Sequence, residues 1–346
     1  MPTTIQHIAD QAGVSAATVS LVLNGKTGIS DATRSRVLRA ASALNYRQKL
    51  PKIAKSKSLG TLRFLKIARH GHTVNRDHGS FIADYMDGMA GEAHRLGYKL
   101  EIASFEGTPM ADIVASIEGT GLDGAIVLGT ELSEADIQLV SAAAVPLVVM
   151  DTFCEFAECN MVNMGNSEAV FKIVSHFAQC GFKRIGFIAS DVQTINFQLR
   201  KSAFVEGIKK LGLRLNPKDI VTVDSTYQGA YEEMLARLHG GLELPEGYFC
   251  CNDIMAYGCI KAFREFDIRI PEALSIIGFD NLPMSATMDP PLTTIDVSKQ
   301  QIAYQAVRLL DEIIRSETKR PAMKILVGSS LVTRKSVIFK VHDSDA

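Results

Sequence analysis

The chain has 346 residues, of which 47% are hydrophobic and 22% charged, and its formal net charge is −1. A chain of this length exceeds the usual size of one compact core, which predicts two or three domains. No apolar run reaches the length of a membrane span, and the opening MPTTIQHIADQAG lacks the basic-then-apolar order of a signal peptide. The composition therefore argues against a membrane or exported protein and predicts a globular, cytoplasmic one.

The charges are divided unevenly along the chain. Residues 1–60 contain nine Lys or Arg and two Asp, a net charge of +7, so the remaining residues carry −8. A small basic region on an acidic body is expected when only the basic region binds a polyanion. A solvated basic face without a partner would have the same composition, so the choice depends on the architecture of that region.

Residues 1–47 have the periodicity of three short helices. Each helix has an apolar face that can contribute to a common core: Ile5, Ile8, Ala9 and Ala12, then Val19, Val22 and Leu23, then Val37, Ala40, Ala41 and Leu44. The candidate N-caps are Thr3 or Thr4, Ser15 and Ser30, and the candidate stops are Gly13 and Asn24-Gly25. Two short helices joined by a glycine-containing turn predict a helix-turn-helix, and the positive charge favours DNA as its partner.

From Gly60 onward, buried strands alternate with amphipathic helices. The predicted strands are 125–128, 146–150, 184–188, 248–251 and 275–279. This alternation predicts doubly wound α/β sheets, whose ligands lie beyond the carboxyl ends of the strands. Asp151, Asn252-Asp253 and Asp280 follow three of these strands. Each could be a simple turn or cap residue, but together they predict a polar cleft.

The basic region carries a specific resemblance. The segment from Thr4 to Tyr46, TIQHIADQAGVSAATVSLVLNGKTGISDATRSRVLRAASALNY, is similar almost position for position to the head of the lactose-repressor (LacI/GalR) family of bacterial transcription regulators. The resemblance implies that the second helix lies in the major groove of DNA. It also implies contacts to DNA for nine residues: Thr4, Ser15, Ala16, Ala17, Thr18, Ser20, Leu21, Asn24 and Tyr46.

Within that set, the resemblance assigns phosphate contacts to Thr4, Ser15, Thr18, Ser20 and Asn24, which position the protein without reading sequence. Ala16, Ala17 and Leu21 fall at the positions that reach base edges. Relatives usually have Arg where this chain has Leu21, and Leu cannot pair with guanine. An apolar surface of this kind suits thymine methyl groups and water-mediated contacts.

The linker at residues 48–59 departs from the family pattern. Relatives have a short helix here whose Leu is wedged into the minor groove, but Lys55 stands at that position and Pro51 would interrupt a helix. One interpretation is a solvated basic tether, and another uses Leu50 or Ile53 as the wedge. We also expect phosphate attraction by the linker lysines Lys49, Lys52, Lys55 and Lys57.

The rest of the chain resembles the periplasmic-binding-protein-like core of the same family. The matching motifs are Arg200-x-x-Ala203-Phe204, Cys251-Asn252-Asp253-Ile254-Met255-Ala256-x-Gly258, Ser275-Ile276-Ile277-Gly278-Phe279-Asp280-Asn281 and Leu331-Val332-x-Arg334-x-Ser336. By that resemblance the effector, a small polar molecule such as a sugar or related compound, binds between two subdomains. The resemblance implies hydrogen bonds from Asp151, Arg200, Asn252 and Asp280, with Phe81 and Phe249 as apolar walls.

The loop at residues 68–79, ARHGHTVNRDHG, also departs from the family. It contains His70, His72 and His78, but no carboxylate or Cys is fixed beside His70-x-His72, so a mobile loop next to the effector is favoured over a metal site. The six cysteines have no paired C-x-x-C spacing and are expected to be buried thiols. We expect no metal, no cofactor and no catalytic residues.

The sequence also has features of two other functional classes. Gly119-x-Gly121-x-x-Gly124 fits a dinucleotide-binding pattern, but it precedes a strand instead of following one, and no hydrolase or metalloprotease motif occurs. A solute-binding protein of a transport system shares the fold of the core but requires export and no basic head. A gel shift with genomic DNA separates that alternative from a regulator.

The prediction is therefore a three-helix helix-turn-helix head (1–47), a basic linker (48–59) and an α/β core (60–340) of two doubly wound parallel-sheet subdomains. The N-subdomain is predicted at 60–160 plus 291–320, and the C-subdomain at 161–290 plus 321–340. The protein is expected to bind a near-palindromic operator as a homodimer and to act as a repressor switched by its effector. The sign of the switch depends on which state the effector prefers. Few residues follow Ser336, and they contain no heptads, so a dimer is favoured over a tetramer.

Overall fold

The computed structural model describes residues 4–23, 29–44, 60–74, 76–318 and 320–340. The chain forms two compact units, Met1–Ser56 and Lys57–Ala346. The boundary falls within the predicted linker. None of the helices in the described ranges is long and apolar enough to cross a membrane.

The first unit contains three helices, as predicted: α1 (Ile5–Ala12), α2 (Ala16–Leu23) and α3 (Asp31–Ala43). Thr4 caps α1, and Gly13 ends it with a φ of 62° in the left-handed region that glycine favours. The Oγ atoms of Ser15 and Ser30 accept hydrogen bonds from the backbone N–H groups three residues later, which caps α2 and α3. The predicted apolar residues form the core, with Leu44 at its margin; the side chain of Leu23 and the stop at Asn24-Gly25 lie outside the described residues.

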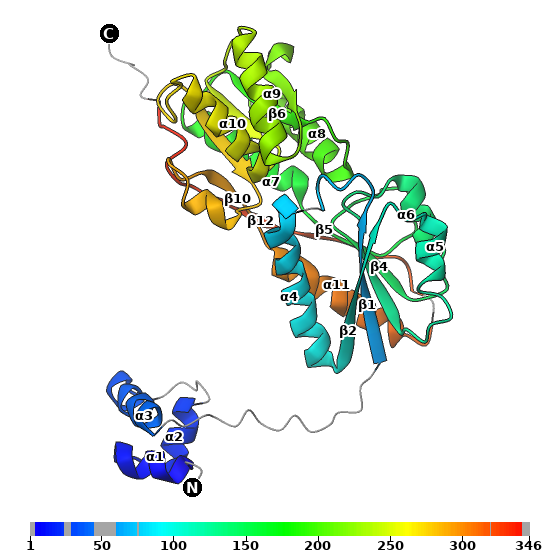
Figure 1. Ribbon diagram of the computed structural model, residues 1–346, viewed down its shortest axis with the longest axis vertical. Coiled ribbons are helices and arrows are strands. Elements are labelled where there is room, and N and C mark those ends of the chain that lie inside the picture. Colours follow the sequence, from blue (N-terminus) through cyan, green and yellow to red (C-terminus); the bar gives the residue numbers. More distant parts are fainter. Residues whose placement is uncertain (1–3, 24–28, 45–59, 75, 319, 341–346) are drawn as a thin grey trace. The chain divides into compact units, whose positions relative to one another are not determined.

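The second unit is built from two six-stranded sheets (Figure 1). The first sheet has the order β11-β5-β4-β3-β1-β2, with all neighbours parallel. Its strands are β1 (Gly60–Ala68), β2 (Tyr98–Glu106), β3 (Gly124–Leu128), β4 (Leu147–Met150), β5 (Met161–Met164) and β11 (Lys324–Val327). Its helices are α4 (Gly79–Leu96), α5 (Met110–Ala115), α6 (Glu134–Ser141) and α11 (Lys299–Ile314), with the short 3-10 helix η1 (Arg76–His78) before α4. We call this part the N-subdomain.

The second sheet has the order β12-β10-β9-β8-β6-β7, parallel except for β12, which runs antiparallel to β10. Its strands are β6 (Ile185–Ser190), β7 (Ile220–Val223), β8 (Gly247–Cys250), β9 (Ser275–Phe279), β10 (Thr293–Val297) and β12 (Ser329–Val332). Its helices are α7 (Asn166–Gln179), α8 (Ile195–Lys210), α9 (Tyr227–His239) and α10 (Asp253–Glu265), with 3-10 helices η2 (Pro217–Asp219) and η3 (Pro283–Ala286). We call this part the C-subdomain.

Helices cover both faces of each sheet, and the strand β1 shows apolar side chains on both of its faces. In β1, Leu62 and Phe64 pack in the cluster that contains α4 and α11, whereas Leu65 and Ile67 pack in the cluster that contains α5 and α6. This alternation is the two-residue period of a strand buried on both faces. All five predicted strands are present, with ends shifted by one or two residues.

The chain crosses between the subdomains near residues 165, 298 and 328, later than predicted at each crossing. The predicted boundaries place β5 and β11 in the C-subdomain and β10 in the N-subdomain, and the sheet pairing contradicts all three assignments. β5 pairs with β4 and β11, and β10 pairs with β9 and β12. The apolar pattern of a short strand does not specify which sheet it joins, so its pairing partner decides.

The turn that contains Gly119 and Gly121 precedes β3, so the dinucleotide-like pattern does not open a helix and is accidental, as predicted. All six cysteines are buried and unbonded, in agreement with the prediction.

Gly258 permits the close packing of α9 against α10. A Cβ atom at this position would meet the carbonyl oxygen of Tyr227, and it would lie 2.9 Å from the N atom of Tyr231 and 3.0 Å from the Cβ of Ala230. We expect Gly258→Ala to lower the free energy of unfolding by about 1–3 kcal/mol, the usual cost of overpacking, in urea denaturation.

Gly91→Ala is the matched control, because Gly91 lies in α4 and a Cβ there meets nothing within 4 Å. That substitution should raise stability by up to about 1 kcal/mol through helix propensity. Equal effects of the two substitutions would contradict the packing argument.

Candidate functional site

A small cavity lies where the carboxyl ends of the two sheets face each other. Asp151 follows β4, Asn252 follows β8 and Asp280 follows β9, so parallel strands bring all three side chains to this cavity as the sequence predicts. The cavity has a volume of about 30 Å³, enough for about one or two water molecules. Its lining comprises Thr73, His78, Phe81, Ile82, Thr130, Asp151, Thr194, Asn196, Phe197, Arg200, Asn252 and Asp280.

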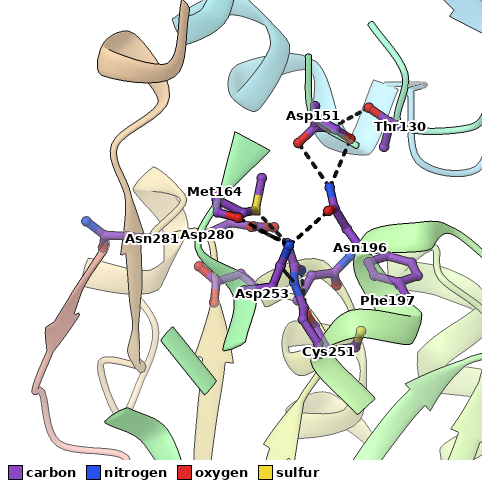
Figure 2. Close-up of polar contacts among 12 residues, drawn as sticks. Thr130, Asp151, Met164, Asn196, Phe197, Cys251, Asp253, Asp280 and Asn281 are labelled. Atoms are coloured by element: carbon purple, nitrogen blue, oxygen red, sulfur yellow. Dashed lines mark hydrogen bonds and ion pairs between the residues drawn. The ribbon is translucent and has the colours of Figure 1, made fainter. Parts of the chain in front are cut away.

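Asp151 is held from both subdomains (Figure 2). Its carboxylate accepts hydrogen bonds from the Tyr85 hydroxyl at 3.0 Å and from the Thr130 hydroxyl. Asn196, on α8 of the C-subdomain, donates from Nδ2 to the backbone oxygen of Asp151 at 2.9 Å and to its Oδ1 at 3.3 Å. Burial raises the pKa of Asp151 to about 6, although these donors and Arg200 favour the ionised form.

Arg200 is buried on the C-subdomain side of the cavity, and most of its donors have partners in the protein. Nε donates to Asn166 Oδ1 at 3.0 Å, and Nη1 donates to the carbonyl of Cys251 at 2.7 Å. Its guanidinium carbon lies 3.7 Å from the centre of the Phe279 ring. The remaining nitrogen, Nη2, lies 3.7 Å from Asp280 Oδ1 and contacts the sulfur of Met164.

Asp280 is the most perturbed carboxyl of the cavity. It has a φ of 110°, which a non-glycine residue rarely adopts and which aims the side chain from the end of β9. Burial raises its pKa to about 7, against the opposing effects of Arg200 and Lys299. Lys299 Nζ donates to the backbone oxygen of Asp280 at 2.8 Å and lies 3.8 Å from Asp84 Oδ2, which links the two subdomains.

Three side chains of the lining each have a buried polar atom without a hydrogen-bond partner. These atoms are Asp280 Oδ1, Asn252 Nδ2 and His78 Nε2. Asn252 Oδ1 is already engaged, because it caps α10 by accepting from the N–H of Met255 at 2.9 Å. Burial lowers the pKa of His78 to about 4, so the ring is neutral near pH 7. Together they present an acceptor, a donor and an imidazole nitrogen to one small volume.

The apolar walls differ from the prediction. Phe81 lines the cavity as expected and packs edge-on against Tyr85, with ring centres 5.0 Å apart. The prediction that Phe249 forms the second wall is wrong, because its ring is fully buried in the core of the C-subdomain between Phe187 and Phe279. Phe197, one helical turn before Arg200 on α8, occupies the wall instead.

Several residues of the site were not predicted from the sequence: Tyr85, Thr130, Asn163, Asn166, Thr194 and Asn196. The amides form a chain behind the cavity, in which Asn163 and Asn166 both donate to Asn196 Oδ1, at 2.8 and 2.9 Å. Asn163 lies in β5, Asn166 begins α7 and Asn196 lies in α8, and the sequence predicts bounds for none of these elements, so it gives no signal for the three amides. Tyr85 carries no signal either, since it looks like an ordinary core residue of α4.

The first part of the loop at residues 68–79 is anchored by one buried carboxylate. Glu131 accepts hydrogen bonds from the N–H groups of Arg69, His70, Gly71 and Thr73 at 2.7 to 3.0 Å, and from the Thr73 hydroxyl at 2.9 Å. The loop does adjoin the cavity through Thr73 and His78, but the prediction that it is mobile is wrong for this anchored part. The described residues contain no group of three His, Cys, Asp or Glu side chains that could hold a metal ion.

In the first unit, the predicted DNA-reading residues lie on α2. Ala17 and Leu21 are exposed one helical turn apart, with 42% of Leu21 accessible, whereas Ala16 packs partly against the small core. Ser15 Oγ lies 2.9 Å from Thr18 Oγ1 at the start of the helix, Ser20 is half-buried, and Thr4 is exposed at the start of α1. Asn24, Tyr46, Lys49, Lys52, Lys55 and Lys57 lie outside the described residues.

The pKa of Asp280 leads to a prediction about stability. Because burial raises that pKa from 3.8 to about 7, the folded protein binds the proton more tightly than the unfolded chain does. The contribution of Asp280 to stability is complete below about pH 4 and is lost as the pH rises to about 7. Asn stays neutral, so the stability of Asp280→Asn relative to the unsubstituted protein should rise by about 2–4 kcal/mol between about pH 4.5 and pH 7.5.

Urea unfolding at the two pH values measures this difference. Asp112→Asn, at an exposed position in the first turn of α5, is the control and should show no such trend. A stability difference for Asp280→Asn that does not change with pH would contradict the prediction.

Comparison with known proteins agrees with both units. The profile of the bacterial regulatory proteins of the lacI family matches residues 4–49, and that of the periplasmic binding protein-like domain matches residues 174–337. The chain is 30% identical over 344 residues to the HTH-type transcriptional repressor PurR of Haemophilus influenzae (strain PittEE), covering 96% of this chain and 98% of the relative. The PurR repressor of Pasteurella multocida (strain Pm70) is 30% identical over 342 residues, with the same coverage.

Two solved structures have the same fold. The transcriptional regulator CelR in complex with cellobiose superposes with a TM-score of 0.71 at 21% identity, covering 96% of this chain and 99% of that one. The lac repressor dimer bound to operator and the anti-inducer ONPF gives a TM-score of 0.71 at 22% identity, covering 98% and 100%. The predicted fold class and family are confirmed. The chain therefore belongs to the lacI family of bacterial regulatory proteins and is a ligand-responsive DNA-binding repressor, not the binding protein of a transport system.

Proposed function

We propose that the protein acts in the cytoplasm as a homodimer at a near-palindromic operator, and that a small polar metabolite bound in the cavity described above alters its affinity for DNA. The observation that carries the effector proposal is the set of three buried polar atoms of Asp280, Asn252 and His78 that have no hydrogen-bond partner. Buried polar groups without partners are costly, so a ligand that satisfies them gains both affinity and selectivity.

The chemistry of these atoms favours a ligand with hydroxyl groups. A hydroxyl can donate to Asp280 Oδ1 and can accept from Asn252 Nδ2, and a vicinal pair does both at once. Phe81 and Phe197 offer apolar faces to the ligand's carbon skeleton. A sugar or related compound has this combination. Because the cavity is small in this structure, binding of such a ligand requires the subdomains to separate further, which couples binding to their relative position.

A thermal-shift screen with ribose, cellobiose and free nucleobases tests the effector proposal. A ligand that binds only the folded state raises Tm with concentration, and we expect a sugar to do so. The same sugar should change the affinity of the protein for operator DNA in a gel shift.

Asp280→Asn should reduce the Tm increase strongly, because an amide can accept through only one of the two positions at which the carboxyl group has oxygens. Asp112→Asn, distant from the cavity lining, is the control and should retain the full increase. A ligand that stabilises Asp280→Asn as much as the unsubstituted protein would bind elsewhere and would overturn the assignment of the site.

For DNA, we propose that Ala17 and Leu21 read base edges while Thr4, Ser15, Thr18, Ser20 and Asn24 contact phosphates. The exposed pair on one face of α2, in a unit with three basic side chains on α3, supports this assignment. Alternation of phosphate and base contacts along one helix is how a recognition helix in the major groove is positioned and then reads sequence.

Leu21→Arg tests whether this position faces the bases. A guanidinium can pair with guanine O6 and N7, worth about 1–3 kcal/mol of discrimination, so the motif selected from random DNA should gain a guanine at one position of each half-site. Leu38→Arg is the control, because Leu38 is equally exposed, at 49%, but lies on α3. The same selected motif for Leu21→Arg and the unsubstituted protein would show that Leu21 does not face the bases.

A further inference from the structure

Two described residues of the connection between β1 and α4, His72 and Asp77, lie against the opposite subdomain. Asp77 Oδ2 accepts a hydrogen bond from the backbone N–H of Tyr227 at 3.3 Å. His72 Nδ1 lies 3.8 Å from Asp224 Oδ2. Both partners stand at the start of α9 in the C-subdomain, although Asp77 and His72 belong to the N-subdomain. Figure 1 shows this connection at the end of the N-subdomain that faces the C-subdomain.

The start of α9 is chemically suited to an acidic partner. Tyr227 is the first residue of this 13-residue helix, and the first N–H groups of a helix have no acceptor within it. Thr226 caps the N–H of Gly229, and Asp224 accepts from the N–H and hydroxyl of Thr226, both at 2.6 Å. The hydrogen bonds within the turn before α9 therefore come from the C-subdomain alone. The N-subdomain contributes the Asp77 carboxylate, which accepts from the N–H of Tyr227 at the end of the helix where the helix dipole favours negative charge.

The other end of the connection is rigidly attached. The hydrogen bonds from residues 69–73 to the buried carboxylate of Glu131 tie the loop to the segment after β3. η1 then leads directly from Asp77 and His78 into α4. A contact made by Asp77 is consequently a contact of the N-subdomain, because η1 continues without a break into α4.

These contacts lie outside the lining of the effector cavity, to which Asp77, His72, Asp224 and Tyr227 contribute nothing. The subdomains are also joined beside the cavity, by Asn196 with Asp151 and by Lys299 with Asp280. A ligand in the cavity would compete with or reorganise the contacts beside the cavity. It would not contact His72 or Asp77, although Thr73 and His78 of the same connection line the cavity.

We propose that the contacts of His72 and Asp77 with the start of α9 form a latch that holds the subdomains together without effector, and that His72 and Asp77 are positioning residues that set the ratio of closed to open molecules. This inference rests on the proposed two-state response to effector. The contacts of His72 and Asp77 then supply part of the free energy that favours the closed arrangement of the two subdomains. Weakening the latch should raise the open population and shift operator affinity even when no effector is present.

The distance between the subdomains tests the latch directly. Spin labels attached to Ala135→Cys on α6 and Ser202→Cys on α8 report on opposite subdomains, at exposed positions, and the native cysteines of the chain are buried. Double electron–electron resonance is measured without DNA or effector, with labelled chains diluted in excess unlabelled chain. Asp77→Ala should lower the ratio of closed to open molecules about three- to tenfold, the net effect of losing one long, half-exposed hydrogen bond.

Asp112→Ala is the matched control, since it also removes an acidic side chain from a helix N-terminus but makes no contact across the subdomains, and its distances should be unchanged. Asp77→Asn retains a neutral acceptor and should give an intermediate ratio. Unchanged distances in both Asp77→Ala and a folded His72→Ala/Asp77→Ala double variant would overturn the latch.

Hydrogen exchange at the Tyr227 amide of the unsubstituted protein gives a second measurement that needs no variant to fold. The latch predicts protection of this amide, and exchange at the rate of an unprotected amide would refute it. Neither experiment includes an effector, so a failed latch leaves the effector proposal standing. Conversely, a failed ligand screen would not alter these distances.

Discussion

The burial of ionisable groups at the meeting point of two sheets is the constraint on which the rest of this structure depends. Asp151, Asp280 and Arg200 are each almost completely removed from solvent, and an isolated charge in that position would be prohibitively costly. The protein offsets the cost for Arg200 with fixed acceptors from Asn166 and Cys251. Asp280 has no such complement of donors, and its raised pKa expresses that difference. The site therefore combines Arg200, whose donors mostly have acceptors in the protein, with Asp280, whose Oδ1 has no hydrogen-bond donor. A polar ligand can supply that donor.

The same constraint, a buried ionisable group, recurs beside the loop at residues 68–79, where the sequence departs from the family pattern. Glu131 is buried, but five hydrogen bonds compensate its charge, and its pKa stays lowered in spite of the burial. Both carboxylate oxygens of Glu131 accept hydrogen bonds from the loop, whereas Asp280 Oδ1 has no hydrogen-bond donor and can accept one from a ligand. The two carboxylates show how burial alone does not define a ligand site. The number of donors already supplied by the protein decides whether a buried acid is structural or open to a ligand.

Much of the fold could be predicted from the sequence because its signals are local. The caps at Thr4, Ser15 and Ser30 and the left-handed Gly13 define the helices of the first unit through contacts within three or four residues. The apolar runs define the strands of the core. The strand ends then place Asp151 at the carboxyl edge of one sheet and Asn252 and Asp280 at the carboxyl edge of the other, since parallel strands share a direction. The assignment of β5, β10 and β11 to their sheets could not be predicted from local signals, because strand pairing is a long-range property.

The sequence by itself determined the helix-turn-helix, the strand and helix alternation and the polar residues that follow the strands, because each depends on neighbouring residues. Only the tertiary structure decided which aromatic ring faces the cavity. Phe249 and Phe197 are the same residue type, so their side chains alone do not distinguish them. In the fold, Phe249 on β8 points into the core of the C-subdomain, whereas Phe197 on α8 lines the cavity. It also decided that Glu131 fixes a loop some sixty residues away in the chain and that Asp77 meets the start of α9. Such pairings arise from packing between distant segments, and no periodicity in the chain encodes them.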